Sequence, residues 1–177
     1  MKDLELLILR LTTGGLLAGH GSQKLFGWFG GHGLEGTGQW LESSLGLAPG
    51  KAWASAAASA EFGGGLLTAL GLFNPLGPVG IISAMSMATA KVHWGKPIWA
   101  SQGGAEFPLT NMAVALAVAF AGPGRYSLDH ALGIRLPRWL VVLTTLAAAV
   151  GLVLGITGQP QLPPETEEEE ATEQVTA

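Results

Sequence analysis

The ionisable residues best suited to chemistry lie within apolar segments of the chain. His20 and Lys24 are four residues apart, so their side chains share one face of a helix. Glu61 is the only charge in a second apolar run. Ionisable groups at membrane depth cost about 2.5–3.5 kcal/mol each, so they are expected to pair or to line a cavity. We therefore predict that Glu61 pairs with Lys24 or His20, in a polar site near one membrane face.

Two further ionisable residues are expected near the same end of the helices. His93 ends a third apolar run, and Glu106 directly precedes a fourth. Four helices would then bring polar groups towards one region near one membrane face. In a competing interpretation, buried ion pairs fix the helix register without any ligand, and His93 and Glu106 are solvated helix ends. The candidate ligand-pocket residues are His20, Gln23, Lys24, Glu61, His93 and Glu106.

The sequence contains no positive enzyme signature. No two metal-ligating residues fall at HxxH, HxxxH or ExxH spacing, so no metal site is predicted, and haem ligation by His20 and His93 meets the same objection. There is no nucleophile elbow or phosphate loop, and no catalytic residue is assigned. The chain has no cysteine, which excludes disulfides and dithiol redox chemistry. Any redox role therefore requires a bound cofactor or a partner.

The composition indicates a protein of the lipid bilayer. Of the 177 residues, 48% are hydrophobic and 12% are charged, whereas soluble domains carry about 25% charged residues. The net charge of −4 comes from the C-terminal end, because six of the thirteen acidic residues follow the last apolar run. The remainder of the chain is mildly basic. We expect the bilayer as the main partner and no nucleic-acid partner.

Five apolar runs predict helices of the length that a bilayer requires, about 20 residues, although the fourth is shorter. The predicted helices cover residues 4–29, 52–73, 76–94, 108–121 and 139–156. The tight turn at Asn74-Pro75 makes the second and third helices antiparallel. After the first helix, Thr37 is expected to cap a short interfacial helix whose narrow apolar stripe includes Trp40.

Small residues at four-residue spacing predict where these helices approach each other closely. Gly15 and Gly19 form such a face on the first helix, with Gly14 and Ala18 beside it, and Ala147, Gly151 and Gly155 form one on the fifth. Arg10 lies one to two turns into the first helix. We expect its long side chain to extend to the nearer lipid headgroups.

Loop charges and tryptophans predict the orientation in the membrane. The connection after the fourth helix is rich in arginine, which favours a cytoplasmic N-terminus and an external C-terminal end. Most tryptophans fall at the opposite face, where the polar site is also expected: Trp28, Trp40, Trp53, Trp94 and Trp99. Residues 159–177 are rich in proline and glutamate and are predicted to be a disordered tail.

Several motifs occur in a fixed order along the chain. They are HGSQKLFGWFGGHGLEGTGQWL at 20–41, AEFGGGLLTALGLF at 60–73, the helix end at His93, GGAEFPLTNMAVA at 103–115 and GPGRYSLDHALG at 122–133. In these motifs the chain resembles the DoxX family of prokaryotic membrane proteins. The resemblance implies an all-α fold, with an antiparallel four-helix transmembrane bundle over residues 1–133 in a prokaryotic plasma membrane. Beyond this bundle, residues 134–158 add a fifth transmembrane helix.

The resemblance also implies which residues occupy motif positions. These are His20, Gln23, Lys24, Gly27, Glu61, Gly64, His93, Glu106, Pro108, Arg125 and Asp129. The family name is tied to the membrane subunit of a thiosulfate:quinone oxidoreductase or of a terminal quinol oxidase complex. The first hypothesis is therefore a quinone-linked oxidoreductase subunit, with a quinone headgroup held between helices one to four by His20, Lys24 or Glu61. The alternative is a non-enzymatic small-solute carrier, or a scaffold that docks a redox partner on the tryptophan-rich face. An oligomer is compatible with both.

Overall fold

The computed structural model describes residues 2–158 of the chain. The described residues form helices joined by loops and include no strand, which confirms the prediction of an all-α protein. Residue 1 and residues 159–177, where a disordered tail is predicted, lie outside the described residues.

The first helix is one continuous rod built from three elements. These are α1 (Lys2–Leu9), a π-helical turn η1 (Arg10–Gly14) and α2 (Gly15–Phe26). The rod ends at Gly27, which adopts a left-handed conformation with φ of 71°. Glycine reaches this conformation without strain and is therefore the usual residue after a helix C-terminus.

The remaining long helices lie where the apolar runs predict them. They are α4 (Gly50–Leu70), α5 (Leu76–Ala88) with its π-helical extension η3 (Thr89–His93), α6 (Glu106–Ala121) and α8 (Arg138–Thr157). Two shorter helices, α3 (Gly33–Leu45) and α7 (Leu128–Leu132), lie outside those runs. Short 3₁₀ turns occur at η2 (Trp28–Gly30) and η4 (Ala100–Gln102).

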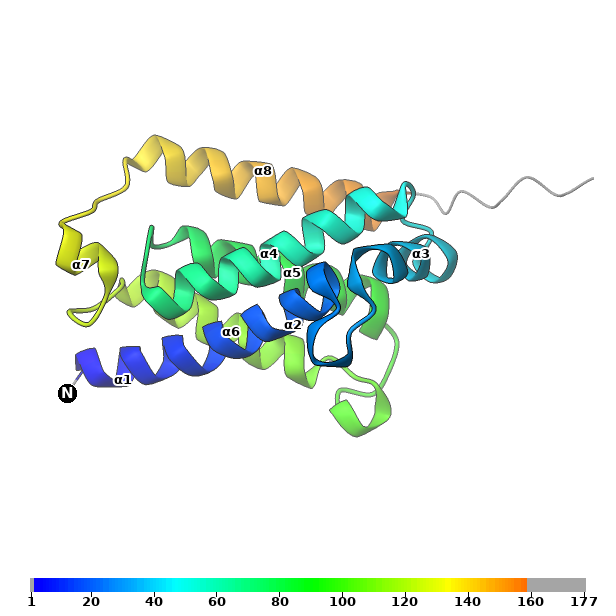
Figure 1. Cartoon of the computed structure of the whole chain (residues 1–177), viewed down its shortest axis with the longest axis horizontal. Coiled ribbons are helices and arrows are strands. Elements are labelled where there is room, and N and C mark those ends of the chain that lie inside the picture. Colours follow the sequence, from blue (N-terminus) through cyan, green and yellow to red (C-terminus); the bar gives the residue numbers. More distant parts are fainter. Residues whose placement is uncertain (1, 159–177) are drawn as a thin grey trace, which may run out of the picture.

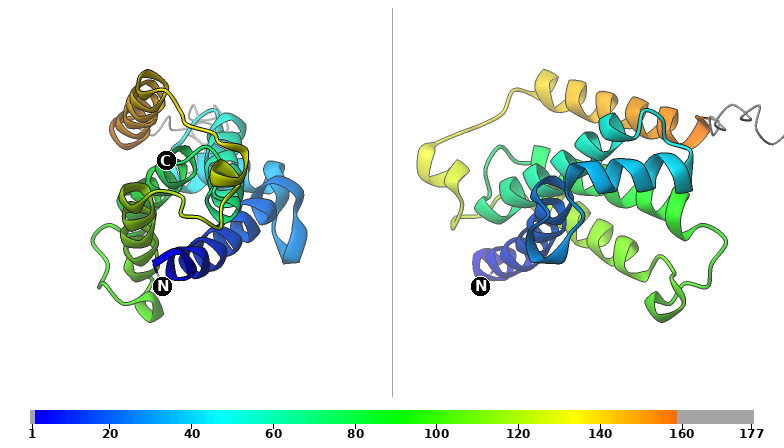
Figure 2. Two further views of the ribbon diagram at one scale, coloured as in Figure 1. Left: turned by 90° about the vertical axis from the view of Figure 1, so that its left-hand side faces the viewer. Right: turned by 45° about the vertical axis from the view of Figure 1, so that its right-hand side comes forward.

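The long helices run roughly along the longest axis of the molecule (Figure 1). The N-terminus, the turn between α4 and α5, and α7 lie at one end, which we call the N-terminal end. The helix α3 and the loop of residues 94–105 lie at the other end, which we call the α3 end. Seen along the axis, α8 lies on the side of the bundle away from α1 (Figure 2, left).

Among the described residues, α8 is the helix that is both long and apolar enough to cross a membrane. The helix α6 is apolar but shorter, with 16 residues. The other long helices contain more small and polar residues, which suits packing against other helices.

The first helix and α4 approach each other closely through glycine. A Cβ atom on Gly14 would lie 2.6 Å from the backbone oxygen of Gly65, and one on Gly65 would lie 3.0 Å from Cα of Ala18. A Cβ on Gly15 or Gly19 would meet nothing within 4 Å. The close approach of the first helix is confirmed at Gly14 and Ala18, and the prediction was wrong for Gly15 and Gly19. The two faces have the same residue spacing. Only the face of Gly14 and Ala18 also carries a large buried side chain, Leu17, that packs into the bundle.

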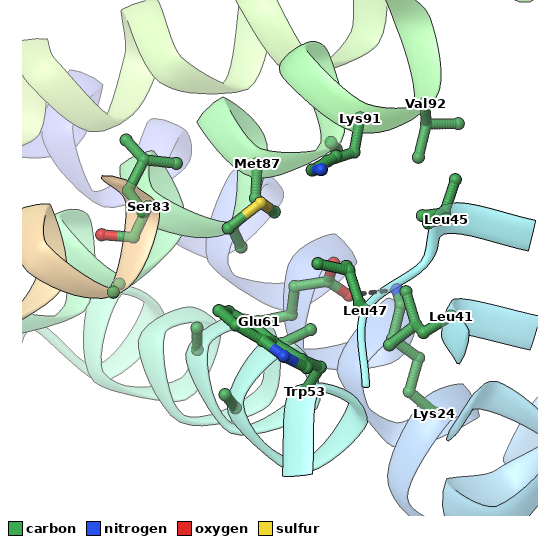
Figure 3. A pocket seen from close by; sticks show the side chains of 18 of the residues that line it. Lys24, Leu41, Leu45, Leu47, Trp53, Glu61, Ser83, Met87, Lys91 and Val92 are labelled. Atoms are coloured by element: carbon green, nitrogen blue, oxygen red, sulfur yellow. Dashed lines mark hydrogen bonds and ion pairs between the residues drawn. The ribbon is translucent and has the colours of Figure 1, made fainter. Parts of the chain in front are cut away.

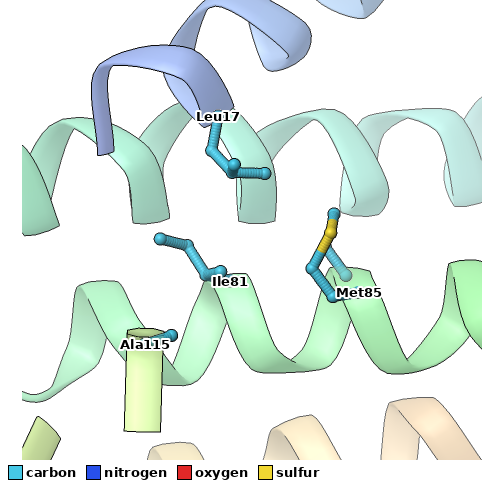
Figure 4. Packing of buried hydrophobic residues seen from close by; sticks show 5 residues of the cluster. Leu17, Ile81, Met85 and Ala115 are labelled. Atoms are coloured by element: carbon cyan, nitrogen blue, oxygen red, sulfur yellow. The ribbon is translucent and has the colours of Figure 1, made fainter. Parts of the chain in front are cut away.

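The buried hydrophobic cluster at the centre joins the first helix, α5 and α6 (Figure 4). Leu17 and Ile81 are fully buried and face each other across it, next to Met85 and Ala115. A second cluster packs α3 and the following segment onto α4 through Leu41, Leu47 and Ala54. These two clusters hold the helices whose inner surfaces form the site described below.

Two sequence-based predictions about this framework are wrong. The short helix begins at Gly33, so Thr37 lies within α3 and is buried instead of capping it. The reason is that the glycine-rich segment before α3 folds back directly onto α2: a Cβ on Gly31 would collide with Gln23. Arg10 is 1% exposed and does not extend to headgroups, because it is buried among backbone carbonyls.

Candidate ligand pocket

The central polar feature of the molecule is an ion pair between the first helix and α4. Lys24 is in the last turn of α2, and Glu61 is near the middle of α4. The close packing of these helices brings Lys24 Nζ to 2.5 Å from Glu61 Oε2. Glu61 is 6% exposed, so its carboxylate is screened from solvent by protein and neutralised by the lysine. The predicted pairing of Glu61 with Lys24 is confirmed.

This ion pair lies on the wall of a cavity of about 480 Å³ (Figure 3). The size is within the range of small-molecule sites, roughly 300–1,000 Å³. Residues from the first helix, α3, α4, α5 with η3, and α8 line it, and most are apolar or small. The lining includes Trp40, Leu41, Leu45, Leu47, Trp53, Ala57, Ala60, Gly80, Ser83, Ala84, Met87, Ala147, Ala148 and Gly151.

A second cation, Lys91, also lines the cavity. It is half-buried on η3, and within residues 2–158 it makes no ion pair. Figure 3 shows its ammonium group projecting into the space across from Glu61. With Lys24 and Glu61 balancing each other, Lys91 leaves the cavity with an excess positive charge.

Sequence reasoning missed Lys91 as a site residue, although a signal for it exists. Gly80, Ala84, Met87 and Lys91 recur at spacings of three or four residues, which places them on one face of a helix. All four line the cavity. A lysine on the otherwise apolar or small face of a helix is a candidate for a buried contact.

The other predicted site residues do not line this cavity. His20 is exposed, and its ring packs edge-on against Phe107 with the ring centroids 5.4 Å apart. Gln23 Nε2 is 3.4 Å from the carbonyl oxygen of Phe29, so it holds the chain segment that follows α2. Neither residue contacts the Lys24–Glu61 pair in this arrangement.

His93 and Glu106 instead hold the loop between η3 and α6. His93 Nδ1 donates a hydrogen bond to the carbonyl of Gly103 over 2.6 Å. Glu106 Oε2 accepts one from the backbone N–H of Ala100 over 2.8 Å. Both are exposed or half-buried, as solvated helix ends would be. The structure therefore brings together Lys24, Glu61 and Lys91 and separates them from His93 and Glu106.

A second buried polar cluster lies at the N-terminal end. The guanidinium of Arg10 donates to carbonyl groups from two parts of the chain, the end of α4 and the loop before α7. The acceptors are Thr68 (3.2 Å), Ala69 (3.3 Å), Tyr126 (2.7 Å) and Pro123. A single side chain thus ties the C-terminal turn of α4 to the loop before α7.

Asp129 completes this cluster from α7. Its two carboxylate oxygens accept hydrogen bonds from the backbone N–H groups of Phe73 and Asn74, each over 2.8 Å. Gly71 contacts both residues: its carbonyl accepts a hydrogen bond from the backbone N–H of Asp129 over 3.0 Å, and a Cβ on it would be 2.7 Å from Arg10 Cζ. The cluster joins the first helix, α4, the α4–α5 turn and α7. We assign it a structural role.

No group of three or more histidine, aspartate or glutamate side chains that could hold a metal ion occurs among residues 2–158. The ligand chemistry of the cavity therefore comes from ammonium and carboxylate groups and from its apolar walls.

Comparison with known proteins relates the chain to one family. The family model for DoxX matches residues 5–94, which is half of the chain and includes Lys24, Glu61 and Lys91. No curated protein and no solved structure matches the chain. The matched segment covers the first helix, α3, α4 and α5 with η3, but not α6 or α8. The ordered motifs, the helical fold and this match together establish that the chain belongs to the DoxX family and is an integral membrane protein.

Proposed function

We propose that the protein crosses the bilayer five times, through the first helix, α4, α5 with η3, α6 and α8. At 1.5 Å per residue, the 21 residues of α4 and the 20 of α8 extend about 30 Å, the thickness of a bilayer hydrocarbon core. The large apolar side chains exposed on the outer surface support this arrangement, among them Leu16, Leu66, Leu116, Phe120 and Val150. The charge of the arginine-rich connection favours a cytoplasmic N-terminal end and an external α3 end.

We further propose that the protein is the membrane subunit of a quinone-linked oxidoreductase and that the cavity binds the quinone. The observation that carries this proposal is the cavity itself, which combines apolar walls with two lysines and a glutamate. A quinone has carbonyl oxygens on a compact ring and a long apolar tail. The charged groups and the apolar walls match these two parts.

The chain's residues would bind and orient such a ligand in distinct ways. Lys91 lacks an ion-pair partner within the described residues, so its ammonium group is available to donate a charge-assisted hydrogen bond to a ring oxygen. Glu61 holds Lys24 in place and can accept a proton at its carboxylate. The side chains of Trp53 and Leu41, which line the cavity, would contact the ring.

The bound quinone would supply the electron-carrying chemistry, which the side chains of this chain lack. Because the sequence has no cysteine, thiol redox chemistry is not available to it. Electrons would then pass between the quinone and a partner protein, and this protein would contribute the binding site and proton transfer at Glu61.

Small molecules extracted from detergent-purified protein test this proposal by mass spectrometry. Quinone should be present in wild-type protein and in the His20→Ala variant, whose altered residue lies outside the cavity. In Lys91→Met it should fall at least about tenfold, because a hydrogen bond to a charged group contributes roughly 1.5–3 kcal/mol. A fatty acid or other lipid in place of quinone would contradict the quinone assignment.

A second candidate function, a scaffold for a redox partner, is favoured by aromatic residues at the α3 end. Trp94 is 81% exposed, Trp99 60% and Trp28 56%, so these side chains do not pack in the interior of the bundle. A pull-down should then lose the partner with Trp94→Ala and Trp99→Ala and retain it with Trp139→Ala at the opposite end. If all three variants retain the partner, the tryptophans serve as anchors in the membrane interface.

A further inference from the structure

We propose that α8 is the wall against which the hydrocarbon tail of the bound amphiphile lies, and that Gly151 sets the width of the cavity for that tail. This inference rests on the proposed function, because it concerns the same cavity. It adds that the ligand is a single-chain amphiphile lying lengthwise between the α3 end and the middle of α8.

The cavity is polar at one end and apolar at the other. Lys24, Glu61 and Lys91 lie towards the α3 side, whereas the α8 ribbon borders the side of Ser83 (Figure 3). The part of α8 that lines the cavity carries no polar side chain: Ala147, Ala148, Gly151 and Leu152. Ser83 uses its hydroxyl internally, donating to the carbonyl of Val79 over 2.8 Å. A headgroup with oxygen acceptors suits the charged end, and a hydrocarbon chain suits the other.

The two glycines of α8 differ in their surroundings: α8 is packed tightly at Gly155, and open space lies beside Gly151. A Cβ on Gly155 would lie 3.0 Å from Sδ of Met87 and 3.0 Å from Trp53, so α8 is packed tightly there. A Cβ on Gly151, one turn earlier, would meet nothing within 4 Å. The four-residue spacing predicts one continuous packing face on α8. In the structure, Gly155 packs against its neighbours, whereas Gly151 leaves a gap. Apolar gaps of this kind stay dry and take up apolar ligands.

The proposed wall, α8, lies outside the segment that the family model matches, residues 5–94. The helix packs on α5 and lines the cavity, and it lies on the side of the bundle away from α1 (Figure 2). A residue of α8 that faces the gap can therefore determine which tails fit without disturbing the Lys24–Glu61 pair.

The absence of cysteine permits a direct test with single-cysteine variants. Gly151→Cys places a thiol in the gap. Ala149→Cys places one on an exposed position of the same helix that does not line the cavity. Each purified variant is labelled with N-ethylmaleimide alone, with decylubiquinone, or with 1-decanol, which has the same alkyl chain. At ten times its Kd, decylubiquinone should slow labelling of Gly151→Cys about tenfold and leave Ala149→Cys unchanged.

The outcomes separate this inference from the proposed function. If 1-decanol protects Gly151→Cys and decylubiquinone does not, α8 is a tail wall but the cavity does not select quinones. If wild-type protein retains quinone and neither probe protects Gly151→Cys, the quinone proposal stands and the α8 wall is refuted. If quinone is not retained and neither probe protects, both proposals fail.

A bulky substitution gives an independent measurement. Gly151→Leu should fill the gap, so co-purified quinone should fall at least about tenfold while the thermal unfolding midpoint stays at or above the wild-type value. Ala149→Leu is the matched control and should retain both quinone and stability. Undiminished quinone in Gly151→Leu would overturn the assignment of Gly151 as the residue that sets the width.

Discussion

At the scale of single residues, the Lys24–Glu61 ion pair is part of the cavity in which we propose that a ligand binds. The pair of Lys24 and Glu61 fixes the first helix against α4, and the same pair lines a cavity. The cavity also contains a second cation, Lys91, which has no ion-pair partner within residues 2–158 and on which the proposed ligand binding rests. The two halves of the pair should therefore affect stability, whereas Lys91 should affect ligand binding.

Removing one charge of the pair should destabilise the protein. Glu61→Gln leaves the Lys24 ammonium, whose side chain is 31% exposed, without its carboxylate, and should lower the free energy of unfolding by about 1–3 kcal/mol. The double variant Lys24→Met/Glu61→Leu removes both charges and should be closer to wild type. Thermal unfolding in detergent measures both. A double variant less stable than Glu61→Gln would contradict this account.

Arg10 should be among the most sensitive positions for folding. Its guanidinium bonds to four carbonyls at once, which the three donors of lysine on a flexible stem cannot reproduce. Arg10→Lys should therefore lower the free energy of unfolding by about 2–4 kcal/mol. Arg125→Ala removes an exposed arginine side chain and should change it by less than about 0.5 kcal/mol. Equal thermal midpoints for the two variants would show that the buried cluster is dispensable.

At the scale of elements, the contact between the first helix and α4 positions the site. Lys24 reaches Glu61 because glycines let the two backbones approach, as the contacts of Gly14 and Gly65 show. A regular small-residue pattern does not reveal which of two neighbouring glycines faces the partner. The structure makes that distinction. Substitutions on the two faces should therefore change the free energy of unfolding in opposite directions.

Gly14→Ala and Gly15→Ala form a matched pair that tests this contact. The first places a methyl group 2.6 Å from the backbone of α4 and should destabilise by about 1–3 kcal/mol through overpacking. The second meets nothing within 4 Å and should be neutral or stabilise by up to about 1 kcal/mol, because alanine favours the helix. Thermal unfolding of both variants measures the difference. The opposite order would mean that the first helix is rotated relative to α4.

At the scale of the whole molecule, the proposed five spans place the two ends of the bundle on opposite sides of the membrane. The residues at the N-terminal end include exposed positions of α7, and those at the α3 end include exposed positions of η4. Each end can be labelled separately, since a single introduced cysteine has no background in this chain.

Labelling of intact cells with a membrane-impermeant maleimide tests this topology. Ser101→Cys at the α3 end should react in intact cells, and His130→Cys on α7 should react only after lysis, because the arginine-rich connection favours a cytoplasmic N-terminal end. The reverse pattern would invert the orientation. Labelling of both variants in intact cells would contradict the five spans.

The sequence alone determines the long helical segments, the turn at Asn74-Pro75 and the expectation that Glu61 pairs with a cation of the first helix, Lys24 or His20. These follow from local chemistry: apolar periodicity defines the helices, and two opposite charges within apolar runs have few ways to avoid the cost of burial. The ordered motifs also identify the DoxX family, since they extend over several helices.

Only the tertiary structure decides which faces meet. Helical spacing fixes the angular position of a side chain on its own helix but not the rotation of that helix against its neighbours. For this reason His20, one turn from Lys24, faces outwards, and Arg10 is enclosed by carbonyls that are distant in sequence. For the same reason Lys91 and the small residues of α8 share one cavity, which no local pattern in the chain connects.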